Sequence, residues 1–171
     1  MLKVIAFDVF NTVVRFEHVP YAEKKAYADH IHEHDGVQSP WKPLTLPESW
    51  ERLPAYPDAA EGLAMLRERY TVVTCSNGPL GMLAKLSKFN GLSWDMITPL
   101  ELNQVYKPNG AAYLFVTDLL GIKPEEMMMV TANEKFGDLE AATELGMQSK
   151  LVRSEWNGQP TIIDLAKELG C

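Results

Sequence analysis

From about residue 57 onward, short apolar runs alternate with longer stretches that carry apolar residues at helical spacing. A similar apolar run near the start of the chain predicts a buried strand at residues 2–7, and the later short runs predict strands at residues 70–75, 95–98, 127–131 and 149–152. The longer stretches predict helices at residues 58–69, 79–90, 108–120, 137–145 and 162–169. This alternation is typical of an α/β protein, and we expect a doubly wound parallel sheet with helices on both faces.

Residues 16–56 interrupt the alternation soon after the first strand. A helix is predicted at 21–33, and the segment that follows is rich in prolines and tryptophans, namely Pro40, Trp41, Pro43, Pro47, Trp50, Pro54 and Pro57. We expect a small helical and irregular insertion that covers the carboxyl edge of the sheet, set into a core made of residues 1–15 and 57–171. A plain surface crossover is the alternative interpretation.

The charge and composition of the chain narrow the classes of partner. Its 171 residues carry a net charge of −7, which argues against a nucleic-acid or anionic-membrane surface but leaves a small anionic substrate open, since one local lysine can outweigh distant acids. The two cysteines, Cys75 and Cys171, form no disulfide framework or zinc pattern. With no apolar run near the roughly 20 residues of a membrane span and no visible signal peptide, we expect a cytoplasmic protein. A homodimer remains open.

Polar residues follow the predicted strands at the points where they end. In an open α/β sheet, these ends converge on one crevice. A carboxylate buried there is costly unless something pairs with it, so Asp8 is either an ion-paired structural charge or a catalytic group. The set predicts a nucleophile, a cation, polar donors and a second carboxylate; its members are Asp8, Asn11, Thr12, Ser76, Asn77, Lys107, Asn133 and Asp138.

Four segments resemble, in order and spacing, the motifs of the haloacid dehalogenase superfamily, and most closely those of its 2-haloacid dehalogenase branch. They are residues 8–14, 76–81, 106–108 with Tyr113 following, and 129–142. The resemblance implies a Rossmann-like core with a cap after the first strand. Two departures stand out: Asn11 lies where the branch usually has Gly, and residues 134–136 look like an insertion.

The resemblance also implies catalytic roles. Asp8 is expected to be the nucleophile, Lys107 the cation that keeps it ionised, and Thr12 the hydroxyl that positions it. Ser76 and Asn77 are expected to donate to the substrate, although both could simply cap the next helix.

The remaining site residues are expected to act on water or on the substrate. Asp138 or Asn133 would orient the water that attacks an aspartyl ester, although Asp138 could serve only as a favourable helix N-terminal charge. Phe10, Asn11, Tyr113 and Asn133 are expected to contact the substrate. Core packing is the rival explanation for Tyr113.

Phe10 separates two reactions of this superfamily. Its phosphatases carry an Asp two positions after the nucleophile, which protonates the leaving alcohol and typically contributes about 10²–10⁴ in rate. Phe10 cannot donate a proton, whereas a halide leaves without one. We therefore expect a 2-haloacid dehalogenase that needs no cofactor. The alternatives are a Mg²⁺-dependent phosphatase, with the ion held by Asp8, the Phe10 carbonyl and Asp138, and a non-catalytic binding protein.

The insertion is shorter than the cap of the dehalogenase branch, which supplies an arginine to the halide. Arg15 and Arg52 are the candidates here, with no motif behind either. The four histidines of the insertion could form a metal cluster, but a solvated helix face is favoured for them; they are His18, His30, His32 and His34.

Overall fold

The computed structural model describes residues 1–37, 44–153 and 158–171. Its centre is a parallel five-stranded sheet in the order β3-β2-β1-β4-β5. The strands are β1 (Val4–Phe7), β2 (Thr71–Thr74), β3 (Met96–Ile97), β4 (Met127–Thr131) and β5 (Gln148–Leu151). From β1, the chain adds β2 and β3 toward one edge of the sheet and then β4 and β5 toward the other edge. The strand order therefore reverses at a switch point between β1 and β4. Ligands of open α/β sheets bind beside such a switch, outside the carboxyl ends of the strands.

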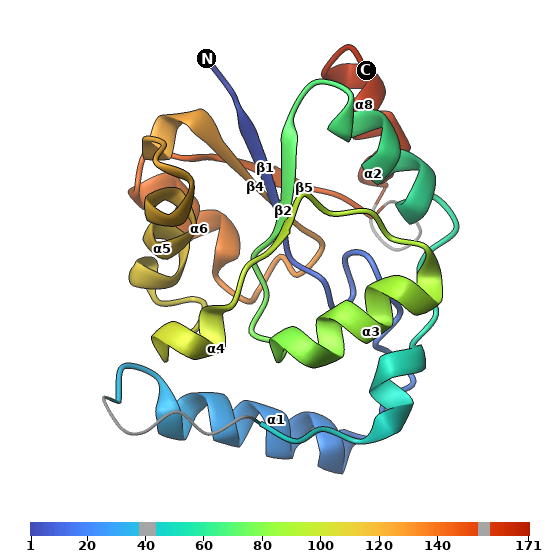
Figure 1. Cartoon of the computed structure of the whole chain (residues 1–171), viewed down its shortest axis with the longest axis vertical. Helices are drawn as coiled ribbons and strands as arrows, with labels where there is room; N and C mark the ends of the chain where they lie inside the picture. The colour runs from blue at the N-terminus through green and yellow to red at the C-terminus, as the bar shows by residue number, and fades with distance from the viewer. Residues whose placement is uncertain (38–43, 154–157) are drawn as a thin grey trace.

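Helices cover both faces of the sheet (Figure 1). One face packs against α2 (Ala59–Arg67), α3 (Leu80–Asn90) and α8 (Ile162–Glu168). The other packs against α4 (Leu100–Asn103), α5 (Gly110–Leu120) and α6 (Asp138–Glu144). The predicted fold class is therefore confirmed. The sequence did not predict α4 or the short 3₁₀ helices η1 (Glu48–Arg52) and η2 (Pro124–Glu126), because one helical turn is too short to show a period.

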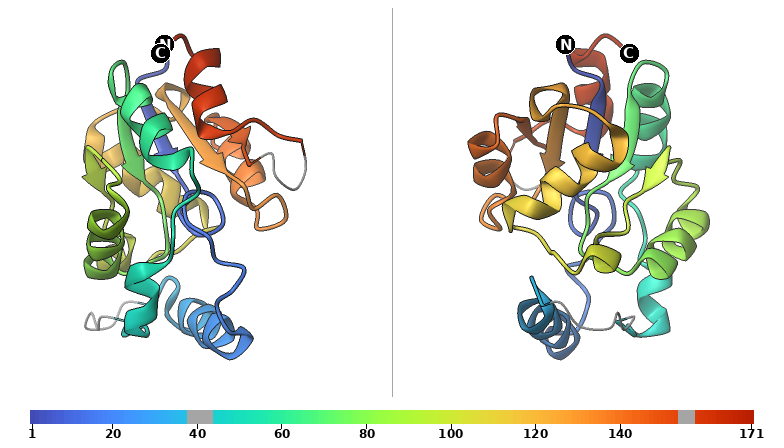
Figure 2. Two further views of the ribbon diagram at one scale, coloured as in Figure 1. Left: turned by 90° about the vertical axis from the view of Figure 1, so that its right-hand side faces the viewer. Right: turned by 60° about the vertical axis from the view of Figure 1, so that its left-hand side comes forward.

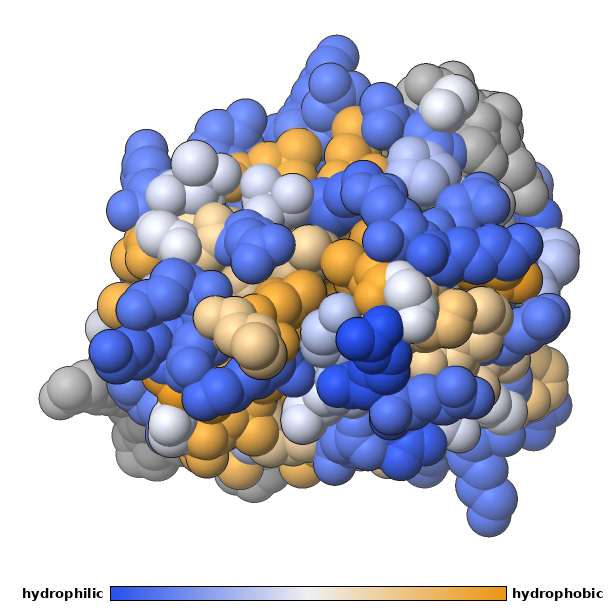
Figure 3. All heavy atoms as spheres, turned by 90° about the horizontal axis from the view of Figure 1, so that it is seen from above, coloured by the Kyte–Doolittle hydropathy of each residue, from blue (hydrophilic) through white to orange (hydrophobic). Residues whose placement is uncertain are grey.

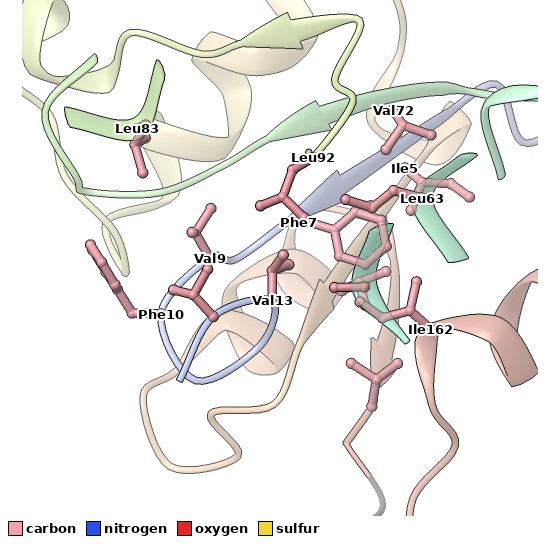
Figure 4. Close-up of a cluster of buried hydrophobic side chains, with 14 of the residues drawn as sticks. Ile5, Phe7, Val9, Phe10, Val13, Leu63, Val72, Leu83, Leu92 and Ile162 are labelled. Atoms are coloured by element: carbon pink, nitrogen blue, oxygen red, sulfur yellow. The ribbon is translucent and has the colours of Figure 1, made fainter. Parts of the chain in front are cut away.

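The two apolar layers arise from alternation along β1. Ile5 and Phe7 enter the layer under α2 and α8, and Val4 and Ala6 enter the layer under α5 and α6, since successive side chains of a strand point to opposite faces. Figure 4 shows the first layer continuing into the loop after β1, where Phe10 lies at its edge. This packing holds the start of that loop rigidly against the sheet.

The helix α1 (Tyr21–His34) lies beyond the carboxyl ends of the strands, apart from the layers of the core (Figures 1 and 2). None of its residues is fully buried. It is joined to the core by a cluster of aromatic rings, Phe10, Phe16, Tyr27 and Trp50, with centroids 4.7–5.9 Å apart. The indole of Trp50 is completely buried and donates to Glu23 of α1 at 2.7 Å.

Trp50, one of the two tryptophans of the proline-rich segment, therefore anchors α1 to the core. Trp41, Pro40 and Pro43 lie outside the described residues. The division into a core and a separate cap of residues 16–56 stays a prediction.

The opposite end of the molecule, next to both termini, presents mostly polar residues with apolar ones in small groups between them (Figure 3). Among the described residues, no helix combines the length and the apolar character needed to cross a bilayer.

Candidate active site

The loop after β1 presents Asp8 at the carboxyl edge of the sheet. It is a tight turn in which the amides of Val13 and Val14 both donate to the Val9 carbonyl. Asn11 adopts a left-handed conformation with φ of 65°, which Asn tolerates better than most residues. The backbone conformation thus explains why Asn can stand where related sequences have Gly.

A buried ion cluster surrounds Asp8. The ammonium of Lys107 lies 2.9 Å from Asp8 Oδ1 and 3.1 Å from Asp138 Oδ2. All three side chains are shielded from solvent, with 6%, 3% and 0% of Asp8, Lys107 and Asp138 exposed. Buried charges of this kind persist only when paired, and the sequence-predicted pairing of Asp8 with Lys107 is present.

The cluster shifts the pKa values of its members. Burial raises the pKa of Asp8, and the nearby Lys107 ammonium counteracts this only in part. Burial works to lower the pKa of Lys107, but the carboxylates of Asp8 and Asp138 outweigh it, so the net shift is upward. The lysine therefore stays charged across the physiological range.

The two oxygens of Asp8 have different partners. Oδ2 accepts hydrogen bonds from Thr12 Oγ1 at 2.8 Å and from Asn133 Nδ2 at 2.6 Å. Oδ1 accepts one, from Lys107. A carboxylate oxygen has two lone pairs, so Oδ1 keeps one for a reaction while Oδ2 is held on both sides.

Ser76 and Asn77 follow the carboxyl end of β2, which lies next to β1 in the sheet. Asn77 accepts from the Lys107 amide at 2.8 Å and donates to the Lys107 carbonyl at 2.9 Å. Ser76 Oγ accepts from the Gly78 amide at 3.2 Å, and both side chains line the cavity described below. The side chain of Asn77 thus holds the backbone of Lys107 in place.

Tyr113 lies away from the position that substrate contact would require. It is completely buried, and its hydroxyl donates to Asp138 Oδ1 at 2.5 Å. Asp138 therefore has both oxygens engaged, one by Tyr113 and one by Lys107. Neither Asp138 nor Tyr113 is among the residues that line the cavity. The expectation that Tyr113 contacts the substrate is not supported by this geometry, because Tyr113 packs against the far side of Asp138.

A cavity of about 1030 Å³ opens beside Asp8. Its walls come from three regions: the edge of the sheet, helix α1 and the loop after β4. Those of its lining residues that the sequence predicted for the site are Asp8, Phe10, Asn11, Ser76, Asn77, Lys107 and Asn133. Asn133 also donates to the Phe10 carbonyl at 2.9 Å and accepts from Asn11 at 3.3 Å, so it joins the loops after β1 and β4.

Asp35, directly after α1, also lines the cavity, and sequence reasoning missed it. Its carboxylate accepts from the Tyr106 amide at 2.8 Å, and the Gly36 amide donates to the Gln104 carbonyl at 2.8 Å. The end of α1 is therefore bonded to the loop that carries Lys107. No motif signals this contact, since the partners lie 71 residues apart in the chain.

None of the arginines in the described residues lines the cavity. Arg15 pairs with Glu17 at 3.3 Å and Arg52 with Glu48 at 3.8 Å, and neither of these sequence candidates for a halide ligand lines the cavity. Arg153 is buried behind the first loop, where it donates to the Thr12 carbonyl and pairs with Asp58. Its role is to brace that loop.

The geometry does not suit a magnesium ion between Asp8 and Asp138, because the Lys107 ammonium lies there. The third expected ligand, the Phe10 carbonyl, already accepts a hydrogen bond from Asn133. Within the described residues, no group of three or more His, Cys, Asp and Glu side chains could hold a metal. The histidines of α1 form no such group either; His30 and His34 stack on each other instead.

Comparisons with known proteins identify the family of this chain. A family model for haloacid dehalogenase-like hydrolases matches residues 23–146. The chain is 32% identical over 141 residues to (S)-2-haloacid dehalogenase 4A of Burkholderia cepacia, covering 80% of this chain and 57% of that protein. It is 35% identical over 88 residues to (S)-2-haloacid dehalogenase of Xanthobacter autotrophicus, covering 50% of this chain and 34% of that protein.

The chain thus matches only part of the length of these curated relatives, 57% of the first and 34% of the second. The crystal structure of the L-2-haloacid dehalogenase PA0810 matches with a TM-score of 0.83 at 23% identity, covering 99% of this chain and 100% of the other. That likeness shows the shared fold. Because the family model covers more than half of the chain, the protein belongs to the haloacid dehalogenase-like hydrolases.

Proposed function

We propose that this protein hydrolyses a 2-haloacid through a covalent aspartyl ester and without a metal ion. The observation that supports this most is the Lys107 ammonium between Asp8 and Asp138. It supplies, within the chain, a positive charge that pairs with the nucleophile and with the second carboxylate. Phe10 offers no proton for an alcohol leaving group, which favours halide as the leaving group.

In the first step, Asp8 Oδ1 attacks the carbon that bears the halogen. The new C–O bond forms as the carbon–halogen bond breaks, and the halide departs with the bonding electron pair. Thr12 and Asn133 hold Oδ2 and thereby orient the carboxylate. Such orientation lowers the barrier because the reacting atoms start near the attack geometry.

In the second step, water attacks the carbonyl carbon of the aspartyl ester. The ester C–O bond at that carbonyl breaks, a 2-hydroxyacid and one proton are released, and Asp8 regains its carboxylate with one oxygen from water. We assign orientation of this water to Asn133, which contacts Asp8 and lines the cavity. Asp138 acts through Lys107, since it contributes no surface to the cavity and pairs with the Lys107 ammonium.

A substrate panel with and without metal tests the proposal. We expect (S)-2-chloropropionate or a longer 2-haloacid to release halide at the same rate in EDTA and in Mg²⁺, and p-nitrophenyl phosphate to remain intact. Phosphate-ester turnover that EDTA abolishes would instead establish the phosphatase. Release of neither product from a broad panel would leave the binding protein as the surviving explanation.

The acid limb of the pH profile is expected to lie above the ordinary carboxyl range. Asp8 must be ionised to attack, and its pKa is raised by burial, so kcat/KM should fall as the pH drops through a value above about 4. No loss is expected toward alkaline pH until beyond the ordinary lysine value of about 10, because the pKa of Lys107 is raised. Halide release measured from pH 4 to 10 checks this; an acid limb below pH 4 would contradict it.

A further inference from the structure

The cavity beside Asp8 is much larger than a two- or three-carbon haloacid requires. Its volume is about 1030 Å³, which is at the upper end of the roughly 300–1,000 Å³ typical of pockets for drug-sized ligands. A short haloacid would leave most of this space to water. Water beside Asp8 would weaken the electrostatic effect of Lys107 on the reacting carboxylate, since charges interact more strongly in a water-excluded site.

The outer walls of the cavity are mixed in character. Their charged and polar residues are Lys24, His32, Asp35, Glu134 and Lys135, and their large apolar residues come from three segments. Helix α1 contributes Tyr27 and Ile31, the segment before it contributes Phe16, and the loop after β4 contributes Phe136. These side chains come from two regions of the chain that lie far apart in the sequence, residues 16–31 and the loop that holds Phe136, so the fold gathers them around a single space. Apolar side chains of this kind bind the carbon body of a ligand, while polar groups orient its reacting end.

Phe136 is the wall residue whose placement is hardest to explain without a ligand. Its side chain is 45% exposed, and its ring centroid lies 5.4 Å from the Lys107 ammonium. It therefore sits between solvent and the reacting groups. It also belongs to residues 134–136, which look like an insertion relative to the related motif. Of the large exposed apolar side chains among the described residues, Phe136 alone lines the cavity.

We infer, on the basis of the proposed function, that the substrate is a 2-haloacid with an apolar body the size of a phenyl ring or a six-carbon chain, and that Phe136 determines this specificity. The carbon body lies along the wall formed by Ile31, Tyr27 and Phe136. The halogen-bearing carbon faces Asp8 Oδ1. Burial of each additional methylene against these walls should favour the longer substrate.

The test compares 2-bromopropionate with 2-bromooctanoate, which share the leaving group and the reacting carbon and differ only in chain length. For the wild type, kcat/KM for bromide release is expected to be at least about tenfold higher for the octanoate. Phe136→Ala should reduce this ratio about fivefold or more. Phe89→Ala is the matched control, since Phe89 is also exposed, at 57%, and does not line the cavity; it should leave the ratio unchanged.

The outcomes separate this inference from the proposed function. Bromide release with equal or better use of the propionate would overturn the inference and leave dehalogenation standing. An octanoate preference that Phe136→Ala does not alter would overturn the role of Phe136. Bromide release from neither acid would overturn the proposed function together with the inference.

Discussion

Asp8→Asn is expected to lower kcat for halide release by about 10⁴-fold or more, the scale seen when a nucleophile is removed from an enzyme. An amide is not a nucleophile at carbon. The variant also places an NH₂ group among three donors, from Thr12, Asn133 and Lys107, so one hydrogen bond is lost. We expect a loss of about 1–3 kcal/mol in the free energy of unfolding, small enough for the fold to persist.

Halide release and thermal unfolding of the variant check this expectation. Asp118→Asn is the control, because it makes the same change at an exposed position of α5 that does not line the cavity. For the wild type, a single turnover in ¹⁸O water should place one ¹⁸O in the Asp8 carboxylate, detectable by mass spectrometry of the peptide. Label in the hydroxyacid product alone would sink the covalent mechanism, since water would then have attacked the substrate directly.

Lys107→Met is expected to lower kcat by about 10²–10³-fold, as loss of one electrostatic donor does, and to move the acid limb of the pH profile upward. Methionine fills similar space but leaves Asp8 and Asp138 buried without their shared cation. The pKa of Asp8 then rises further, since the ammonium that lowers it is gone. Loss of a buried partner costs about 3–5 kcal/mol of stability, which denaturant unfolding will measure.

Two further variants separate the electrostatic effect from general damage. Lys85→Met removes an exposed lysine of α3 that pairs with Glu51, and it should change neither activity nor pH profile. The double variant Lys107→Met/Asp138→Asn removes one carboxylate along with the cation, and it should regain part of the lost stability but little activity. An unshifted acid limb in Lys107→Met would show that Lys107 does not control the ionisation of Asp8.

Much of the fold could be predicted from local patterns. The strands and helices from residue 57 onward are local in origin, because each depends on the spacing of apolar residues within one short window. Gly91 and Gly121 end α3 and α5 with φ of 64° and 61°, which is the usual role of Gly at a helix C-terminus. The pairing of Asp8 with Lys107 was also expected, since parallel strands bring their carboxyl ends together.

Other parts of the site depend on contacts that no local pattern encodes. Asp35 reaches the Lys107 loop across 71 residues, and Arg153 reaches the Thr12 carbonyl across 141. Both contacts depend on how α1 and the segment after β5 pack against loops that are distant in the sequence. Tyr113 shows the converse: its place in the motif suggested the substrate, but the packing of α5 on the sheet directs it to Asp138.

The sequence by itself determined the order of strands and helices and which polar residues stand at the strand ends, because hydrophobic spacing acts over a few residues. Only the tertiary structure decided which of those polar groups share a buried, ion-paired cluster and which face the cavity. Burial and charge pairing act through space. The different partners of the two Asp8 oxygens, the pairing of Asp138 with Lys107 and Tyr113, and the position of Phe136 at the cavity therefore exist only once distant segments have packed.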